Sequence, residues 1–175
     1  MITVASVVEG DGEVRALPVL VRRIAHEHGV YDVEVPFPFR LPRTKFLIPA
    51  EFARAVEFQA RRVVDRGGGV ALLDADDDCA VELTKRIRTA YDGHRSFVLV
   101  ASVREYESVL LVGHGVPADV AESKRDAKGE LRQRLGAYRE TVHQAKLSAA
   151  LDLDMARGCR WFRKFESDLL AVLRG

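Results

Sequence analysis

Ile2-Thr-Val-Ala-Ser-Val-Val8, followed by Glu9-Gly-Asp-Gly-Glu13, is the segment from which the fold of this chain is most readily predicted. Its β-branched, apolar first half is typical of a strand that is buried on both faces, as in a mainly parallel sheet. The glycines of the second half permit a tight turn, and apolar residues then recur at helical spacing from Val14 to Ile24. The chain is therefore predicted to open with a strand followed by a helix.

The same alternation continues along the chain. Further strands are predicted at residues 31–35, 70–74 and 97–101. Helices are predicted from Glu51 to Val63, from about 80 to 91, and from about Arg104. The helix stops are predicted at Gly67-Gly-Gly69 and Asp92-Gly93, and an irregular connection is predicted around Pro36, Pro38, Pro42 and Pro49. Strands that alternate with helices predict an α/β fold: a mainly parallel four-stranded sheet with flanking helices.

The length and composition suit one domain. A chain of 175 residues with 47% hydrophobic content can bury one sizeable core without dividing. We expect an α/β core over residues 1–115 and a helical C-terminal extension over 116–175, packed on the same domain. The last helix is predicted from about Arg160 to Leu173, with its aromatic and aliphatic residues on one core-facing side.

Several function classes are disfavoured by composition. The apolar stretches fall far short of the roughly 20 residues that span a bilayer, and the N-terminus lacks a signal-peptide pattern, so no membrane association and a cytoplasmic location are expected. Cys79 and Cys159 follow no zinc-ligand or disulfide spacing, which predicts two reduced thiols.

The charge is nearly balanced but unevenly spread. Residues 1–119 hold 15 basic and 18 acidic side chains, whereas residues 120–175 hold 12 and 8. This modest basic bias permits contact with a polyanion but falls well short of showing it, and a plain solvated surface is the favoured interpretation. Lys124, Arg125 and Lys128 form a basic run in which Lys124 and Lys128 are candidates for binding phosphate oxygens, although a solvated turn is an open alternative.

Acidic residues follow three of the predicted strands. Glu9 ends the first strand, the run Asp74-Ala-Asp-Asp-Asp78 ends the third, and Glu105 and Glu107 follow the fourth. In open α/β sheets ligands bind outside the carboxyl ends of the strands, so these acids are expected to converge at one edge. Carboxylates gathered there repel one another unless a cation offsets the repulsion or one of them is protonated.

All-oxygen ligands without His or Cys favour a hard metal, Mg²⁺ or Mn²⁺. Such an ion activates water and stabilises the charge of an in-line phosphoryl displacement, with Glu9 as a ligand or general base. In the alternative interpretation, one of the aspartates at 76–78 caps the following helix. Glu105 and Glu107 are two residues apart and do not share a helical face, so at most one of them would point into the site if that segment is helical.

Two other motif interpretations fail on particular residues. An EF-hand loop beginning at Asp74 would need Gly and Glu where this chain has Cys79 and Lys85. A dinucleotide-binding fingerprint beginning at Gly10 would place its third glycine at Arg15. The acidic strand ends therefore remain the principal functional signal.

The arrangement of these acids resembles the TOPRIM domain of topoisomerases, primases and overcoming-lysogenization-defect nucleases. Over nearly its full length the chain is similar to the DUF4276 family of TOPRIM-like proteins. The residues that carry the similarity are Val8-Glu-Gly10, Leu72-Leu-Asp-Ala-Asp-Asp-Asp-Cys79, Val103-Arg-Glu-Tyr-Glu107, Tyr138, Gln144, Asp152 and Cys159 to Phe165. The run from Leu72 to Cys79 is the most specific of them.

The resemblance implies a TOPRIM/Rossmann-like fold and a metal-dependent nuclease-like activity on nucleic acid, with DNA favoured over RNA. It further implies a partner ATPase of the AAA or ABC type and a role against phage. The implied catalytic residues and metal ligands are Glu9, Asp74 and Asp76, and the implied auxiliary ligands are Asp78 and Glu107 or Glu105.

The chain departs from the family pattern at Val109, where Trp is usual, and at Gly113, where Asp is frequent. The second departure places in doubt a ligand at the end of that helix. The alternative function is that of a non-catalytic TOPRIM-fold protein that binds or regulates an AAA or ABC-type ATPase.

Overall fold

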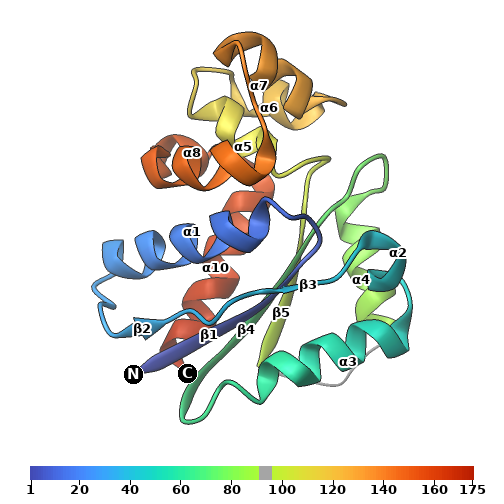
Figure 1. The fold of residues 1–175 in the computed structure, drawn as a ribbon, viewed down its shortest axis with the longest axis vertical. Coiled ribbons are helices and arrows are strands. Elements are labelled where there is room, and N and C mark those ends of the chain that lie inside the picture. Colours follow the sequence, from blue (N-terminus) through green and yellow to red (C-terminus); the bar gives the residue numbers. More distant parts are fainter. Residues whose placement is uncertain (91–95) are drawn as a thin grey trace.

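The computed structural model describes residues 1–90 and 96–175. A five-stranded parallel sheet forms its centre, with strand order β2-β1-β4-β5. The fifth strand, β3, pairs with the end of β1, on the same side as β2. Helices cover both faces (Figure 1), as the sequence predicts. The elements are β1 Ile2–Val8, α1 Glu13–Glu27, β2 Val33–Glu34, β3 Phe39–Arg40, α2 Arg43–Phe46, α3 Pro49–Ala60, β4 Arg66–Asp74, α4 Ala80–Ala90, β5 Phe97–Ser102, α5 Glu107–Val112, α6 Ala118–Ser123, α7 Ala127–Leu135, the π-helix η1 Glu140–Gln144, α8 Ala145–Ala150, α9 Leu153–Ala156 and α10 Arg160–Arg174.

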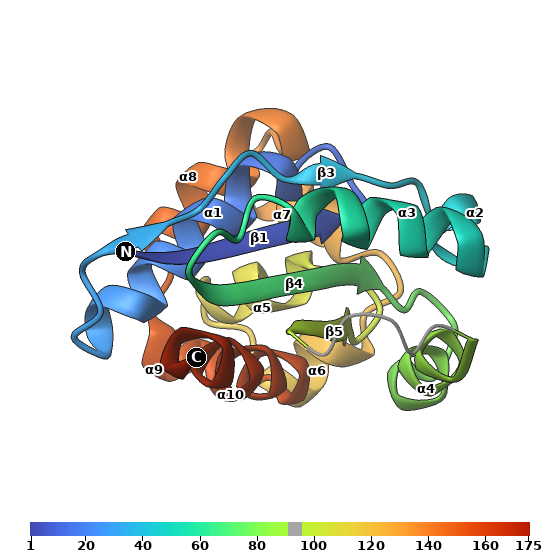
Figure 2. The same cartoon turned by 90° about the horizontal axis from the view of Figure 1, so that it is seen from below.

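Alternate residues of the central strands face two separate cores. Val4, Val70 and Val100 pack with α1 and α10 on one face, whereas Ala71 and Leu99 pack with α2, α3 and α4 on the other. Figure 2 shows this division along the sheet, with α1 and α10 on one side and α3 and α4 on the other. The C-terminal helix is therefore part of the main core of the molecule.

The first strand has two short neighbours on its outer side where one was predicted. β2 pairs with the beginning of β1, through Ile2 and Val33, and β3 pairs with its end, through Val7 and Phe39. Between them lie Pro36 and Pro38, which have no amide hydrogen to donate to a sheet. The prolines thus divide one edge strand in two, and the sheet gains a strand in the segment that was predicted to be irregular.

The glycine run 67–69 was predicted to stop a helix, and this prediction is wrong. α3 ends at Ala60, and all three glycines belong to β4. A Cβ on Gly67 would lie 2.0 Å from the Thr3 carbonyl oxygen, and a Cβ on Gly69 would lie 2.2 Å from the Phe97 ring. The glycines therefore allow neighbouring backbone and an aromatic ring to approach the strand.

The remaining boundaries lie close to their predicted positions. α4 extends to Ala90, and its predicted end at Asp92-Gly93 lies outside the described residues. The helix predicted from about Arg104 begins at Glu107. Helices α5, α6 and α7 lie above the carboxyl ends of the strands in Figure 1, and α8 lies over α1. Within the described residues, no helix combines the length and the apolar character that crossing a membrane requires.

Candidate metal centre

Asp74, the last residue of β4, joins the ends of three strands. Its Oδ1 accepts hydrogen bonds from the Ser102 hydroxyl (2.6 Å) and the Tyr106 amide (2.8 Å), both on the chain that leaves β5. Its own amide donates to Glu9 Oε2 at 3.1 Å, at the end of β1. The carboxyl ends of β1, β4 and β5 therefore meet at this aspartate.

A buried polar group lies next to Asp74. Gln144 Nε2 donates to Glu13 Oε1 (3.1 Å) and to Glu107 Oε1 (3.0 Å), and the Tyr138 hydroxyl donates to the same Glu107 oxygen at 2.7 Å. Glu13 lies in the first turn of α1, Glu107 in that of α5, and Gln144 in the π-helix η1. π-Helical turns are rare and frequently occur at functional sites.

Three oxygens of this group are buried without a hydrogen-bond partner among residues 1–90 and 96–175: Glu13 Oε2, Glu107 Oε2 and Gln144 Oε1. A Cβ on Gly10 would lie 2.2 Å from Glu13 Oε2, and a Cβ on Gly12 would lie 2.3 Å from Gln144 Oε1. The two glycines therefore make room for buried polar side chains. This close approach explains the Gly10-x-Gly12 pattern without a nucleotide.

The acids raise one another's pKa. Burial is the largest cause for Asp74, and repulsion from Glu13 and Glu107 adds to it, so the pKa of Asp74 lies well above its ordinary value. Burial likewise raises the pKa of Glu13, and it raises the pKa of Glu107 to about 7, although Lys128 opposes the rise at Glu107. Burial also raises the pKa of Glu9. The cluster is thus short of positive charge for this number of carboxylates.

A second group of acids surrounds Arg43, the first residue of α2. Its guanidinium lies 3.8 Å from Glu9 Oε2, 3.4 Å from Asp76 Oδ2 and 2.7 Å from Asp78 Oδ2. It also donates to the backbone carbonyls of Asp74 and Ala75. One arginine therefore balances the three partly exposed carboxylates.

The loop after β4 has an unusual backbone. Asp76 and Arg104 are non-glycine residues with positive φ, 51° and 63°, and the Asp76 amide donates to the Arg104 carbonyl at 2.9 Å. Such conformations cost free energy and are concentrated at functional sites. The partners of the three loop carboxylates are arginines: Asp76 and Asp78 contact Arg43, and Asp77 contacts Arg104 at 2.8 Å.

Lys128 is the cation nearest to the buried acids. Its Nζ lies 3.3 Å from Glu140 Oε1 and 4.0 Å from Asp74 Oδ2. Burial opposes its charge, but Glu107, Asp74 and Glu140 outweigh burial and raise the pKa of Lys128. Its amide donates to Glu105 Oε2 at 3.1 Å, so Glu105 fixes the start of α7.

The structure thus distributes the sequence-predicted residues unequally. It brings Glu9, Asp74 and Glu107 to one place, and it puts Asp76 and Asp78 on Arg43 beside them. Lys128 joins the acids, whereas Lys124 forms an ion pair with Glu130 at 3.4 Å. Glu105 contacts the amide of Lys128.

Sequence reasoning assigned no role to Glu13, Arg43 or Gln144. Glu13 had a signal, because it lies one helical turn after Glu9 at the start of a predicted helix, where a side chain can face the ends of the strands. Gln144 also had a signal, because it is one of the residues that carry the resemblance to DUF4276, although no role was assigned to it. Arg43 lies in a segment that carried no motif. Only the folded chain places these residues beside the acids.

A separate acidic group lies at the other end of α1. Glu27, His28 and Glu166 have ligand atoms within 4.8 Å of one another. The guanidinium of Arg157 lies among them, and its Nη2 is 2.8 Å from Glu27 Oε2 and 2.7 Å from Glu166 Oε1. These hydrogen bonds lower the pKa of Glu166. Arg157 balances this group, which forms an ion-pair network, as Arg43 does for Glu9, Asp76 and Asp78 at the strand ends.

The strand-end cluster fits a hard divalent cation in its chemistry. Its donors are carboxylate and amide oxygens, and burial raises the pKa values of its acids. Two of its carboxylate oxygens are buried with no partner in the part of the chain that the structure describes. Mg²⁺ and Mn²⁺ favour such oxygen ligands. Glu9, Asp74 and Asp76 would hold one ion; within the described residues their ligand atoms do not all lie within 4.8 Å of one another, so the carboxylates would have to move closer together around it.

Comparison with known proteins gives one structural likeness. No protein-family profile and no curated protein sequence matches the chain, so membership of DUF4276 stays a prediction. Among solved structures, the C-terminal region of the Burkholderia pseudomallei OLD protein matches with 14% sequence identity and a TM-score of 0.43, covering 97% of each chain. The function proposed below therefore rests on the geometry of the site.

Proposed function

We propose that this chain is a metal-dependent phosphodiesterase that hydrolyses nucleic acid, with DNA as the preferred substrate and with a site of the TOPRIM type. The observation that supports the proposal is the meeting of Glu9, Asp74 and Glu107 at the carboxyl ends of three parallel strands. Oxygen-rich sites at this edge of an α/β sheet suit Mg²⁺ or Mn²⁺.

The chemistry that a divalent ion supplies there is activation of water and stabilisation of the charge on the phosphoryl group. Asp74 is held rigidly, since Ser102 and the Tyr106 amide fix one of its oxygens. Glu9 is partly exposed, 20%, which suits a residue that accepts a proton from the attacking water. Asp76 lies on the strained loop beside it.

The chain also supplies positive charge for a substrate. Lys128 lies between the buried acids and the solvent, with its side chain 30% exposed, and Arg43 is 24% exposed beside Glu9. A phosphodiester placed over the cluster would meet both cations. These cations would stabilise the negative charge that develops on its oxygens during hydrolysis. Lys124 is not included in this proposal, because its Nζ pairs with Glu130 and not with an acid of the strand-end cluster.

The test is nicking of supercoiled plasmid by the purified chain in Mg²⁺ or Mn²⁺. We expect nicking by the wild type, its loss in EDTA, and a loss of at least about a hundredfold in Asp74→Asn and Glu9→Gln. Asp119→Asn, which changes an exposed acid of α6, is the matched control. Equal nicking by Asp74→Asn and the wild type would reject the assignment.

The second candidate function is that of a non-catalytic partner of an AAA or ABC-type ATPase. The observation that favours it is Arg43, which already balances Glu9, Asp76 and Asp78 as a structural cation would. In that case the cluster stabilises the fold and divalent ions do not change it. An ATPase encoded beside this chain, together with absence of nicking by the reconstituted pair, would support the second function over the first.

A further inference from the structure

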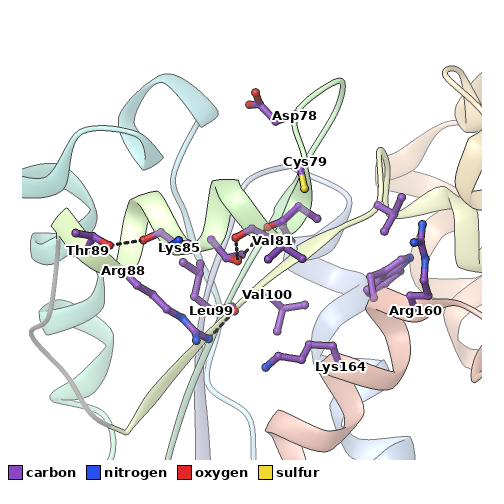
Figure 3. A pocket seen from close by; sticks show the side chains of 15 residues that line it. Asp78, Cys79, Val81, Lys85, Arg88, Thr89, Leu99, Val100, Arg160 and Lys164 are labelled. Carbon is purple, nitrogen blue, oxygen red and sulfur yellow. Dashed lines mark hydrogen bonds between the residues drawn. The ribbon is translucent and has the colours of Figure 1, made fainter.

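A groove of about 640 Å³ lies beside the candidate metal centre, between α4 and α10. Its floor is formed by β5, the last strand of the sheet, through Leu99, Val100 and Ala101 (Figure 3). Successive residues of a strand point to opposite faces of a sheet. Because three successive residues line the groove, it runs along the edge of the sheet and not over one face.

The hydrogen bonds of β5 show which of its backbone groups face the groove. The carbonyls of Ser96 and Ser102 accept from the amides of Gly69 and Ala75, so the even-numbered residues of β5 face β4. In a parallel pair the residues between them direct their backbone groups to the other edge. The Leu99 carbonyl follows this pattern, because it accepts a hydrogen bond from Arg88 Nη2 at 3.0 Å and not from β4. The floor therefore combines apolar side chains with the outward backbone groups of Leu99 and Ala101.

The sides of the groove are cationic. Four of its lining residues are basic, against the single carboxylate of Asp78, and these four are Lys85, Arg88, Arg160 and Lys164. Arg160 pairs with Glu122 at 3.0 Å and Lys164 pairs with Asp168, whereas Lys85 and Arg88 have no acidic partner among the described residues. Among the described residues, the positive charge that has no acidic partner therefore lies on the α4 side, at Lys85 and Arg88, while Arg160 and Lys164 line the α10 side in ion pairs.

One end of the groove reaches the candidate metal centre. Asp78 and Cys79 line it, and Asp78 is the same residue that pairs with Arg43 at 2.7 Å. A chain that followed the groove would arrive at Glu9 and Asp76, which contact that arginine. The Asp78–Arg43 pair therefore links the end of the groove to the acid cluster.

We infer that this groove binds single-stranded nucleic acid next to the candidate metal centre. The inference rests on the proposed function and names the form of its substrate. Basic side chains along a groove follow the phosphates, and an apolar floor accepts unstacked bases. A single strand has unpaired bases that can enter the groove between the basic side chains, whereas the bases inside a duplex are paired and are not free to enter.

The test uses Cys79 as a reporter of position. Cys79 is exposed and lines the groove, whereas Cys159 is buried, and burial raises the pKa of its thiol to about 12. N-Ethylmaleimide therefore reacts with Cys79 in the folded chain. We expect a 15-nucleotide single strand to slow alkylation of Cys79 in proportion to its binding, in EDTA and in Ca²⁺, as followed by mass spectrometry of the two cysteine peptides.

Charge reversal on each side of the groove completes the test. By fluorescence anisotropy, Lys85→Glu and Lys164→Glu should each weaken binding of the strand about tenfold. Each should also lower the slope of log affinity against log salt by about 0.7 for every phosphate that is no longer neutralised. Lys146→Glu, an exposed lysine of α8, is the matched control and should bind as the wild type does. DNA and RNA strands of one sequence show which sugar is preferred.

Four results would overturn the inference: an unchanged alkylation rate at a saturating concentration of strand, no binding of any strand, equal binding by the two groove variants and the wild type, or stronger protection by a duplex or by polyglutamate. Failure of the proposed function is distinguishable, since it leaves Cys79 protected while plasmid nicking is absent. Nicking that depends on Asp74, with Cys79 unprotected, would instead reject the groove alone.

Discussion

Side chains at the carboxyl edge of the sheet differ in how their charge is balanced. Asp74 relies on hydrogen bonds from Ser102 and Tyr106, whereas Glu9 shares the guanidinium of Arg43 with the loop aspartates. The acids at the strand ends could be predicted, because their position follows from the strands themselves. Arg43 could not, since nothing local in its sequence distinguishes it from a solvated arginine.

Arg43 gives the first prediction at this scale. In EDTA we expect Arg43→Met to lower the free energy of unfolding by about 1–3 kcal/mol, because Glu9, Asp76 and Asp78 lose their shared cation. Binding of Mn²⁺ should become tighter, since the guanidinium no longer competes for the same oxygens. Urea unfolding and calorimetric titration measure the two effects.

Arg54→Met is the control for that change, because Arg54 is 76% exposed and pairs only with Glu51 among the described residues. It should alter neither quantity. An unchanged affinity for Mn²⁺ in Arg43→Met would show that the arginine does not share its place with a metal ion.

Glu107 gives a prediction on pH. Its pKa is raised to about 7, so the folded chain holds this proton more tightly than the unfolded chain does. In EDTA its contribution to stability is therefore greatest below its ordinary pKa of about 4.5 and declines as the pH rises through about 7. Glu13, Asp74, Lys128 and Glu140 face the same cluster and shape this titration.

Glu107→Gln should flatten that decline, because an amide keeps the hydrogen bonds from Tyr138 and Gln144 but does not ionise. Thermal melting between pH 5 and 8 measures it, with Glu82→Gln on the exposed side of α4 as the control. A decline as steep in Glu107→Gln as in the wild type would locate the titration elsewhere.

At the scale of elements, the bounds of helices and strands were predicted well wherever apolar residues recur at a single helical or strand spacing. β1, α1 and α10 lie within a few residues of their predicted bounds. The errors are at Gly67–69 and at the prolines before β3, where contacts with other strands decide the structure. A glycine in a strand and a glycine that ends a helix look alike until the neighbouring strand is known.

Gly69 gives the prediction at this scale. By strand propensity alone Gly69→Val should be favourable. We expect it instead to lower the free energy of unfolding by about 2–4 kcal/mol, because its Cβ would meet the Phe97 ring at 2.2 Å. Adding Phe97→Ala should recover part of this loss, as a double-mutant cycle in urea shows. If the loss of stability in the double variant equals the sum of the losses in the two single variants, the proposed contact is contradicted.

At the scale of the molecule, the second half of the chain contributes to both the polar cluster and the core that the first half forms. Gln144 donates a hydrogen bond to Glu13, which lies 131 residues earlier in the sequence, and α10 packs against the core of the sheet. Local patterns predict the helices of this half but not their arrangement around the acids, because no period records which helix ends meet. The division at residue 115 stays a prediction.

We expect the fragment 1–115 to remain unfolded, since it lacks Trp161, Phe162 and Phe165, which are buried against the sheet in the whole chain. Circular dichroism and urea unfolding of the fragment beside the full chain test this. A cooperative transition in the fragment would show that the first 115 residues fold alone.

A calorimetric titration of Mn²⁺ into the wild type, Asp74→Asn and Asp119→Asn decides whether the strand-end cluster is a metal centre. We expect saturable binding of one or two ions by the wild type and by the control Asp119→Asn. Asp74→Asn should lose at least about tenfold in affinity, because that change removes a charged ligand at the meeting point of three strands. Binding of equal strength by all three, or by none, would contradict the assignment of a metal centre to these acids.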